Sequence, residues 1–259
     1  MKPMNANIDL LEAPLEPHVP ETTFGKWFLR TETWTVHVLE RALADLQRLM
    51  PADQPRSFAV VADVGCGFGR SLGKLHQRYT PQRLIGMDID PEMLYEAARE
   101  TAAFNIDAEF ICCSSSNITL EDNSVDLLFC HQTFHHLVDQ ERAIQEFFRV
   151  LKPGGVLLFA ESTRRYIHSW IIRLLFRHPM HVQKTAPEYL AMIRTAGFYA
   201  PGSAVSYPFL WWSREDLGLM ESVLRIKPAA VREETLINVV AVKPCVGAAG
   251  TNAVAGQAE

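Results

Sequence analysis

Short apolar runs alternate with amphipathic segments over the middle of the chain. The runs are apolar at nearly every position, which is the pattern of parallel strands covered on both faces. In the segments between them, apolar residues recur at helical spacing. The strands that we expect cover residues 58–64, 83–88, 108–113, 125–131 and 155–161, and the helices cover 70–79, 91–104 and 140–151. This alternation predicts a doubly wound parallel α/β sheet with right-handed crossovers.

The N-terminal fifth of the chain has a different pattern. Four prolines and little periodicity in residues 1–21 predict an extended or loosely ordered arm. Apolar residues at helical spacing over 32–50 predict a helix that Pro51 ends. The aromatic residues of 24–28 pack on the sheet in the plainer interpretation and fold over a ligand site in the sharper one. We therefore expect residues 1–50 to form an arm and cap helices.

Two candidate lid segments follow the alternating region. Residues 164–184 contain five cations and no acid, with apolar residues between them. One helix with an apolar and a basic side is the simplest interpretation. Its basic side is either plainly solvated, or a cover for an apolar substrate with an anionic group, or a peripheral contact with anionic lipid. The second lid segment is 210–234, with a helical centre at 217–225.

The remaining elements complete one domain. We expect a helix over 186–196, a strand near 203–209 and a final strand over 236–242. The α/β domain would then cover residues 51–245. The tail over 246–259 is rich in alanine and glycine, which is typical of disorder.

Composition and charge exclude several classes of protein. The net charge of −5 argues against general nucleic-acid binding. No apolar run reaches the roughly 18–20 residues of a membrane span, and residues 1–21 lack the basic-then-apolar order of a signal peptide. The five cysteines show no paired metal-ligand spacing, which favours reduced core thiols and a cytoplasmic protein. The oligomeric state is not legible in these patterns.

The most informative stretch is VVADVGCGFGR at residues 60–70. It predicts a buried strand, a glycine-punctuated turn and then the first turn of a helix. Gly65, Gly67 and Gly69 permit positive φ and leave room for a ligand against the backbone. The N–H groups of the following helix point at the same place. The stretch therefore predicts a ligand-binding turn.

Acidic residues beside this turn restrict the kinds of ligand that it could bind. Asp88 ends the second strand, where a carboxylate can accept hydrogen bonds from both hydroxyls of a ribose. The spacing is G-x-G-x-G, whereas dinucleotide enzymes carry G-x-G-x-x-G around a pyrophosphate. Asp63 would repel phosphates and suits a ligand with an ammonium group. These observations favour a nucleoside ligand with a cationic end, and they count against a NAD-type oxidoreductase.

Other polar residues also stand at strand ends. Ligands of doubly wound sheets bind outside the carboxyl ends of the strands. Those ends carry residues 63–67, Asp88, residues 113–115, His131 and Glu161. We expect all of them to meet in one site.

Four sequence motifs carry a resemblance to a known family. VADVGCGFG at 61–69 resembles the first motif of class I S-adenosylmethionine-dependent methyltransferases, and GMDIDPEML at 86–94 looks like their second-strand motif. EDNSVDL at 121–127 and RVLKPGG at 149–155 resemble stretches of the small-molecule branch, which includes the ubiquinone/menaquinone-type enzymes. The resemblance covers about residues 58–161 in the right order.

The resemblance implies a Rossmann-like, seven-stranded sheet whose last strand is antiparallel. It also implies S-adenosyl-L-methionine as the cofactor and methyl transfer to a small-molecule acceptor. Asp63 would hold the ammonium group, and Asp88 would bind the ribose. The remaining implied cofactor contacts are Gly65, Gly67 and His131 at the methionine part, and Ile89, Ser114 and Ser115 at the adenine. Ser114 stands where the family often has an acid, so the adenine contacts depart from the usual pattern.

The candidate catalytic residues are His136 and His135, after the fourth of the central strands. A neutral imidazole can act as a general base or orient the acceptor, and a histidine that only fixes the loop is the plainer alternative. His131 and His135 lack the intervening glutamate of the zinc-protease pattern, so we expect no metal. The candidate substrate residues are Trp27, Glu161, Arg164 and Trp211.

Two other functions stay open at this point. A regulatory protein could bind the same cofactor without transferring a methyl group, and a related enzyme could use the cofactor for another reaction. The expected acceptor is small and partly apolar, with oxygen, nitrogen or carbon as the methylated atom.

Overall fold

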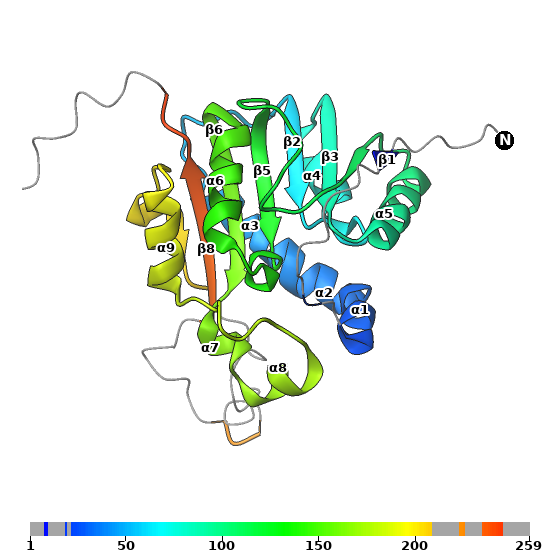
Figure 1. The fold of residues 1–259 in the computed structure, drawn as a ribbon, viewed down its shortest axis with the longest axis vertical. Helices are drawn as coiled ribbons and strands as arrows, with labels where there is room; N and C mark the ends of the chain where they lie inside the picture. Colours follow the sequence, from blue (N-terminus) through cyan, green and yellow to red (C-terminus); the bar gives the residue numbers. More distant parts are fainter. Residues whose placement is uncertain (1–7, 10–18, 20–21, 209–222, 226–234, 246–259) are drawn as a thin grey trace, which may run out of the picture.

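The computed structural model describes residues 8–9, 19, 22–208, 223–225 and 235–245. Within these residues one eight-stranded sheet forms the centre, in the order β1-β4-β3-β2-β5-β6-β8-β7 (Figure 1). The strands are β1 Ile8–Asp9, β2 Val60–Val64, β3 Arg83–Asp88, β4 Glu109–Cys112, β5 Val125–His131, β6 Leu151–Ser162, β7 Val205–Ser206 and β8 Leu236–Val242. Strand order reverses between β2 and β5, which is where a doubly wound sheet opens a ligand crevice.

The sheet confirms the predicted fold class. The seven expected strands are all present, neighbours from β4 to β6 pair in parallel, and β8 runs antiparallel to both β6 and β7. The arm adds one element that periodicity did not predict, because residues 8–9 pair in parallel with β4 as a short edge strand.

Helices flank the sheet and cover its carboxyl edge. The longer helices are α3 Glu40–Leu49, α4 Arg70–Tyr79, α5 Pro91–Ala103, α6 Gln140–Val150 and α9 Ala186–Thr195. The shorter ones are α1 Thr23–Leu29, α2 Glu32–Trp34, the π-helical turn η1 Thr35–Leu39, η2 Phe134–His136, α7 Arg164–Ile167, α8 Trp170–Leu175 and η3 Gly202–Ala204. The expected helix over 32–50 is present as α2, η1 and α3 in succession.

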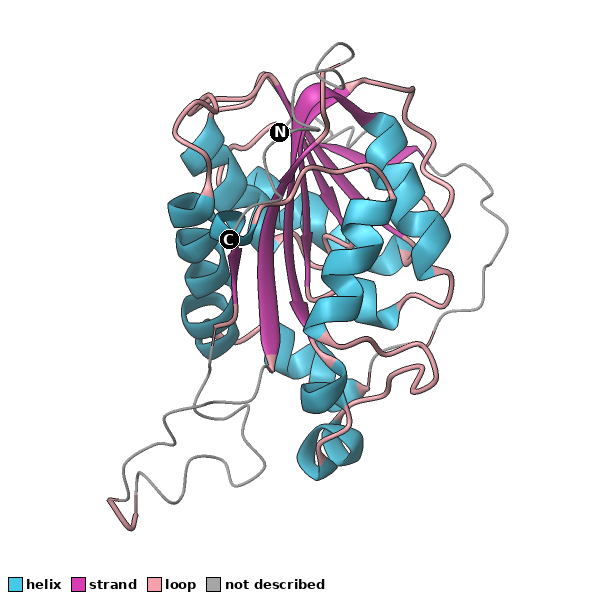
Figure 2. Ribbon diagram, turned by 90° about the vertical axis from the view of Figure 1, so that its left-hand side faces the viewer, coloured by secondary structure: helices cyan, strands magenta, loops and turns pink. Residues whose placement is uncertain are grey.

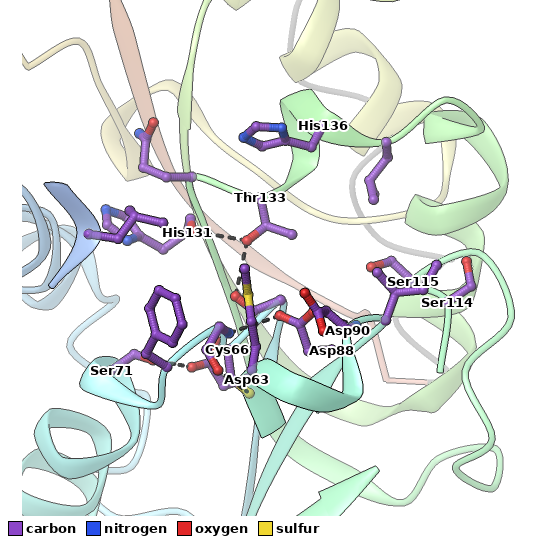
Figure 3. A pocket seen from close by; sticks show the side chains of 18 of the residues that line it. Asp63, Cys66, Ser71, Asp88, Asp90, Ser114, Ser115, His131, Thr133 and His136 are labelled. Atoms are coloured by element: carbon purple, nitrogen blue, oxygen red, sulfur yellow. Dashed lines mark hydrogen bonds between the residues drawn. The ribbon is translucent and has the colours of Figure 1, made fainter. Parts of the chain in front are cut away.

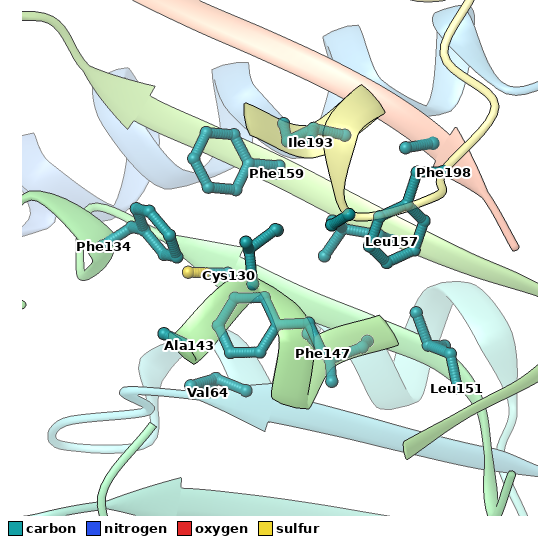
Figure 4. Packing of buried hydrophobic residues seen from close by; sticks show 14 of the residues in the cluster. Val64, Cys130, Phe134, Ala143, Phe147, Leu151, Leu157, Phe159, Ile193 and Phe198 are labelled. Carbon is teal, nitrogen blue, oxygen red and sulfur yellow. The ribbon is translucent and has the colours of Figure 1, made fainter. Parts of the chain in front are cut away.

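Two hydrophobic layers explain why the central strands are apolar at every position. Figure 2 shows the sheet edge-on between its helices. Leu127 and Phe129 of β5 join the cluster under α3, α4 and α5, whereas Leu128 and Cys130 join the cluster under α6 and α9 (Figure 4). Because successive side chains of a strand point to opposite faces, both faces must be apolar when both are covered.

The prediction of a single amphipathic helix over residues 164–184 is wrong. The segment forms α7 and α8, which are separated at Ser169, a residue with extended backbone before α8. Its cations also have acidic partners from distant sequence: Arg164 pairs with Glu188 at 2.8 Å and Lys184 with Glu141 at 2.9 Å. A count of acids within the segment could not reveal partners contributed by α9 and α6.

The N-terminal helices and α8 meet at the carboxyl edge of the sheet. Figure 1 shows α1, α2, α7 and α8 gathered below the strands. The ring of Phe176 contacts those of Phe24 and Phe28, with centroids 5.5 and 6.2 Å apart. The Thr22 hydroxyl donates a hydrogen bond to the Leu175 carbonyl at 2.8 Å. Segments about 150 residues apart in sequence therefore cover the same edge of the sheet.

Two further expectations concern membranes and thiols. No described helix combines the length and apolarity needed to cross a membrane. All five cysteines carry free thiols, and Cys66, Cys113 and Cys130 are buried. The second lid segment, except residues 223–225, and the tail over 246–259 lie outside the described residues.

Candidate functional site

A cavity of about 470 Å³ opens at the carboxyl ends of the strands (Figure 3). All eight residues that we expected to bind a cofactor line it: Asp63, Gly65, Gly67, Asp88, Ile89, Ser114, Ser115 and His131. His136 also lines this cavity. The sequence-based expectation of one shared site agrees with the geometry for these residues, whereas Glu161, which we also expected there, does not line the cavity. The individual contacts of the lining residues stay predictions.

The three glycines of the turn are required for three different reasons. All have positive φ, between 52° and 78°. A Cβ on Gly65 would lie 2.1 Å from Cγ2 of Thr133, so this glycine lets the loop after β5 approach. A Cβ on Gly69 would lie 2.9 Å from Ala97 in α5. A Cβ on Gly67 would meet only Met93, at 4.0 Å. Gly67 is therefore the glycine whose missing side chain leaves room in the cavity.

Asp63 is a buried carboxylate at the end of β2. It accepts a short hydrogen bond from the Ser71 hydroxyl, in the first turn of α4. Burial raises the pKa of Asp63 to about 7, the Ser71 hydrogen bond opposes this shift, and the Asp88 carboxylate adds to it. A cationic group in the cavity would favour the ionised carboxylate and so lower the pKa of Asp63 toward its ordinary value.

Asp88 connects the glycine turn to the beginning of α5. One carboxylate oxygen accepts a hydrogen bond from Gly67 N at 2.9 Å, and the other accepts one from Asp90 N at 3.0 Å. Burial raises the pKa of Asp88, and these two N–H donors oppose the rise. The carboxylate thus fixes the shape of the turn and still has lone pairs for a ligand at the cavity.

The loop after β4 forms another wall of the cavity. Ser114 and Ser116 are buried, with their hydroxyl oxygens 2.9 Å apart, and Ser115 is half-buried. These three serines and Ile89 all line the cavity. The wall offers hydroxyl groups where the family pattern often has a carboxylate.

His131 ends β5 and faces the same cavity. Its ring stacks on Phe129 with centroids 5.6 Å apart and contacts Trp34 at 5.5 Å. Its Nε2 is buried without a hydrogen-bond partner among the described residues. Burial lowers the pKa of His131 to about 3, with His135 acting in the same direction. The neutral ring can therefore offer a polar atom to a ligand at no cost in existing hydrogen bonds.

Glu161 organises the loop that carries the candidate catalytic residues. It is 0% exposed. Its Oε1 accepts hydrogen bonds from Thr133 N and Phe134 N, both at 2.8 Å, and its Oε2 lies 2.7 Å from Nδ1 of His135. The carboxylate at the end of β6 therefore holds η2 against the sheet.

His136 borders the cofactor cavity and also a second cavity of about 90 Å³. His135 lines only the second cavity. Burial lowers the pKa of His136 well below its usual range, and both His135 and His178 act in the same direction. The second cavity is otherwise mostly apolar, with residues Phe28, Leu29, Trp34, Val38, Tyr166, Ile167, Ile172, Phe176 and Leu236 in its lining.

The three expected substrate residues that the structure describes are absent from both cavity linings. Trp27 is 58% exposed, Glu161 is fully buried beneath η2, and Arg164 is held by Glu188 and by the Gln183 carbonyl. Trp211 lies outside the described residues. Their placement gives no support for direct contact with a substrate.

Sequence reasoning missed several residues of the cavity. Thr133 donates through its hydroxyl to the carbonyls of Gly65 and His131, both at 3.2 Å. Gln132 lines both cavities with a backbone φ of +52° and accepts from the Ser162 hydroxyl at 2.6 Å. A non-glycine residue in this region is strained and common at functional sites. Both residues lie in the stretch that drew attention only for its histidines.

Comparisons with known proteins find a family that the central part of the chain resembles. Residues 62–159 match the family model described as a methyltransferase domain. The match covers less than half of the chain, and it includes the glycine turn, Asp88 and His131. The description agrees with the resemblance noted in the motifs, and the fold is the class I, Rossmann-like one.

Individual relatives of the methyltransferase domain differ in what their names say they methylate. A malonyl-[acyl-carrier protein] O-methyltransferase of Marinomonas sp. (strain MWYL1) is 32% identical over 123 residues, which are 48% of this chain and 43% of that protein. A phosphoethanolamine N-methyltransferase of Triticum aestivum is 28% identical over 147 residues, 56% of this chain and 26% of that one. The chain thus spans less than half the length of these curated relatives.

A solved structure shows the same fold in a protein with another name. The [4+2]-cyclase SpnF superposes with a TM-score of 0.59 at 18% identity, over 81% of this chain and 83% of that one. At this identity the likeness concerns the fold alone.

Proposed function

We propose that this protein transfers the methyl group of S-adenosylmethionine to a small, partly apolar acceptor. The observation that carries the proposal is the convergence of Asp63, Gly67, Asp88 and His131 on one cavity within a methyltransferase domain. Two carboxylates and an unpaired imidazole nitrogen suit a ligand with an ammonium group, a sulfonium and two ribose hydroxyls. They do not suit a pyrophosphate.

In this proposal each wall of the cavity binds a different part of the cofactor. Asp63 attracts the ammonium group, and Gly67 lets the methionine part approach the backbone. Asp88 accepts from the ribose hydroxyls with the lone pairs that the turn leaves. The adenine end lies against Ile89 and the loop of Ser114 and Ser115, with His131 at the methionine part.

The acceptor would enter through the second cavity. His136 and Trp34 border both cavities, so an acceptor there would stand next to the methyl group. The mostly apolar lining supports a partly apolar acceptor. His136 would contact the reacting atom and either orient it or take its proton. Alignment alone can lower the barrier by roughly 7–11 kcal/mol, so a nitrogen or carbon acceptor needs no strong base.

The branch and the exact acceptor are finer proposals. The motifs resemble the ubiquinone/menaquinone-type branch, and the apolar second cavity is compatible with a quinone-like ring. The protein would work without nucleic acid or stable membrane insertion.

Label transfer tests the function directly. The chain is incubated with methyl-labelled S-adenosylmethionine and a metabolite extract, and labelled products are found by mass spectrometry. A labelled small molecule that depends on the protein supports the proposal. Binding of the cofactor without any labelled product would favour a regulatory protein, and cofactor turnover to another product would favour a different reaction.

Calorimetry tests the cofactor site. We expect S-adenosylmethionine and S-adenosylhomocysteine to bind and NAD not to bind. Tight binding of NAD alone would overturn the proposal.

A further inference from the structure

Three histidines from two separate segments meet beside the second cavity. His135 and His136 belong to η2, and His178 belongs to the loop after α8. Their ring centroids are 4.4, 4.7 and 5.0 Å apart in pairs. One ring nitrogen from each lies within 4.8 Å of the others. Such convergence brings three potential ligand atoms to one point.

A buried carboxylate fixes the first of these rings. Oε2 of Glu161 lies 2.7 Å from Nδ1 of His135, and neither side chain is more than 5% exposed. Nδ1–H donated to a carboxylate leaves Nε2 as the atom with a lone pair. Histidines that bind metals commonly have this carboxylate partner, which orients the ring and raises its basicity.

A buried amide fixes the loop that carries His178. Nε2 of Gln183 donates to the His135 carbonyl at 2.7 Å and to the Pro179 carbonyl at 3.0 Å. The ring of Phe176, two residues before His178, packs against the rings of α1. The loop is therefore attached on both sides of His178, and one attachment is to the backbone of another histidine of the group.

We propose that His135, His136 and His178 bind one divalent ion of the zinc class. Three imidazoles with a free fourth position are a known ligand set for zinc. Glu161 already accepts hydrogen bonds from η2, so the set offers no carboxylate oxygen and disfavours Mg²⁺ and Ca²⁺. All three histidines line the second cavity, and His136 and His178 are half-buried, so the fourth position of the ion would face this cavity.

Binding requires a small local adjustment. Tetrahedral zinc with Zn–N distances of about 2.0–2.1 Å places its nitrogens about 3.3 Å apart. The three nitrogens here all lie within 4.8 Å of one another, so side-chain rotations must bring them closer by up to about 1.5 Å. His178 comes from the loop and His135 from the core, so the ion would also fasten the cover over the second cavity.

The consequence for catalysis rests on the proposed function, whereas ion binding does not. An oxygen of the acceptor could take the fourth position and be oriented or made more acidic there. In the loaded protein, His136 would act through the ion rather than as a base. The sequence-based expectation of no metal considered only His131 and His135, because nothing in the local spacing connects His178 to them.

Zinc binding is measured on tag-free protein that has been treated with a chelator and dialysed. We expect elemental analysis to find one zinc per chain after loading, and calorimetry with Zn²⁺ to give one site. Co²⁺ should give the visible absorption of a tetrahedral complex, and Mg²⁺ should not compete. His178→Ala should lose the site, while His181→Ala, which alters an exposed histidine of the same loop, should retain it.

Glu161→Gln provides a second test through the ring that it orients, with an expected loss of roughly 10–100-fold in zinc affinity. Binding of S-adenosylhomocysteine and the melting temperature confirm that each variant is folded. The proposal is wrong if His178→Ala binds zinc as tightly as the unaltered protein does. It is also wrong if the unaltered protein retains no zinc. Failure of S-adenosylhomocysteine to bind the unaltered protein would instead refute the proposed function and leave the zinc result standing.

Discussion

Asp63 should make cofactor binding depend on pH. Burial raises its pKa to about 7. The ammonium group of the cofactor would favour the ionised carboxylate, so binding near neutral pH should release a proton. The raised pKa disappears from the complex, and affinity should rise with pH up to about 7.

The magnitude follows from the fraction of Asp63 that must ionise. With a pKa of about 7, about nine tenths of the carboxyl groups are protonated at pH 6 and about half at pH 7. The dissociation constant of S-adenosylhomocysteine should therefore fall about fivefold between these values, which is about 1 kcal/mol. About half a proton per complex should be released at pH 7.

Calorimetry at several pH values, each in two buffers of different ionisation enthalpy, measures both quantities. Asp63→Asn keeps the size of the side chain and removes the charge, so this variant should bind more weakly and lose the fivefold change. Measurements stay between pH 6 and 7 because an α-amino group begins to titrate above this range. The role given to this carboxylate would be refuted if the affinity did not change with pH and no proton were released, or if Asp63→Asn showed the same fivefold change as the unaltered protein.

The same shift has a consequence for the stability of the cofactor-free protein. The folded-state pKa of Asp63 is raised above the unfolded value of 3.8, so its contribution to stability is lost as pH rises from about 4 to 7. Asp63→Asn lacks this loss. It should therefore melt at a higher temperature than the unaltered protein at pH 8, by scanning calorimetry.

Four further substitutions test the turn and the loop. Both Gly65→Ala and Gly67→Ala cost about 1–2 kcal/mol because the backbone has positive φ, but Gly65→Ala should lower the melting temperature more, since only its Cβ would overlap Thr133. Gly67→Ala should instead weaken the binding of S-adenosylhomocysteine. Equal melting temperatures of the two variants would contradict these roles of the two glycines. Asp88→Ala should weaken that ligand by at least about tenfold, since a hydrogen bond to a charged group is worth about 1.5–3 kcal/mol, and unchanged calorimetric affinity would exclude a ribose contact. Glu161→Ala leaves two N–H groups and His135 without a buried acceptor and should cost about 3–5 kcal/mol in denaturant unfolding; a loss below 1 kcal/mol would show that Glu161 does not hold the loop.

The proposed base can be tested separately from the fold. If His136 takes a proton from the acceptor, His136→Ala should lower kcat by roughly 10²–10⁴-fold once an acceptor is known. A normal rate with that acceptor would exclude general-base work by this residue.

Local sequence patterns predicted the elements of the fold well. The strand and helix periods and the glycine spacing depend on neighbours within a few residues, so they are visible in one sequence. They gave the positions of β2 to β6 and of α4, α5 and α6, and they indicated that Asp63, Asp88 and His131 would share one edge of the sheet. The same patterns failed for residues 164–184, where α7 and α8 are separated at Ser169 and the cations pair with acids of distant helices.

The sequence by itself therefore determined seven of the eight strands of the described sheet and the position of the glycine turn. Only the tertiary structure decided what each residue there does. In that structure Thr133 packs closely against Gly65, Glu161 contacts His135 of η2, and His178 lies beside His135. These contacts join segments tens of residues apart, and no period along the chain records them. The glycine turn could be predicted from the residues next to it in the sequence. The residues that surround it in space depend on how distant segments pack.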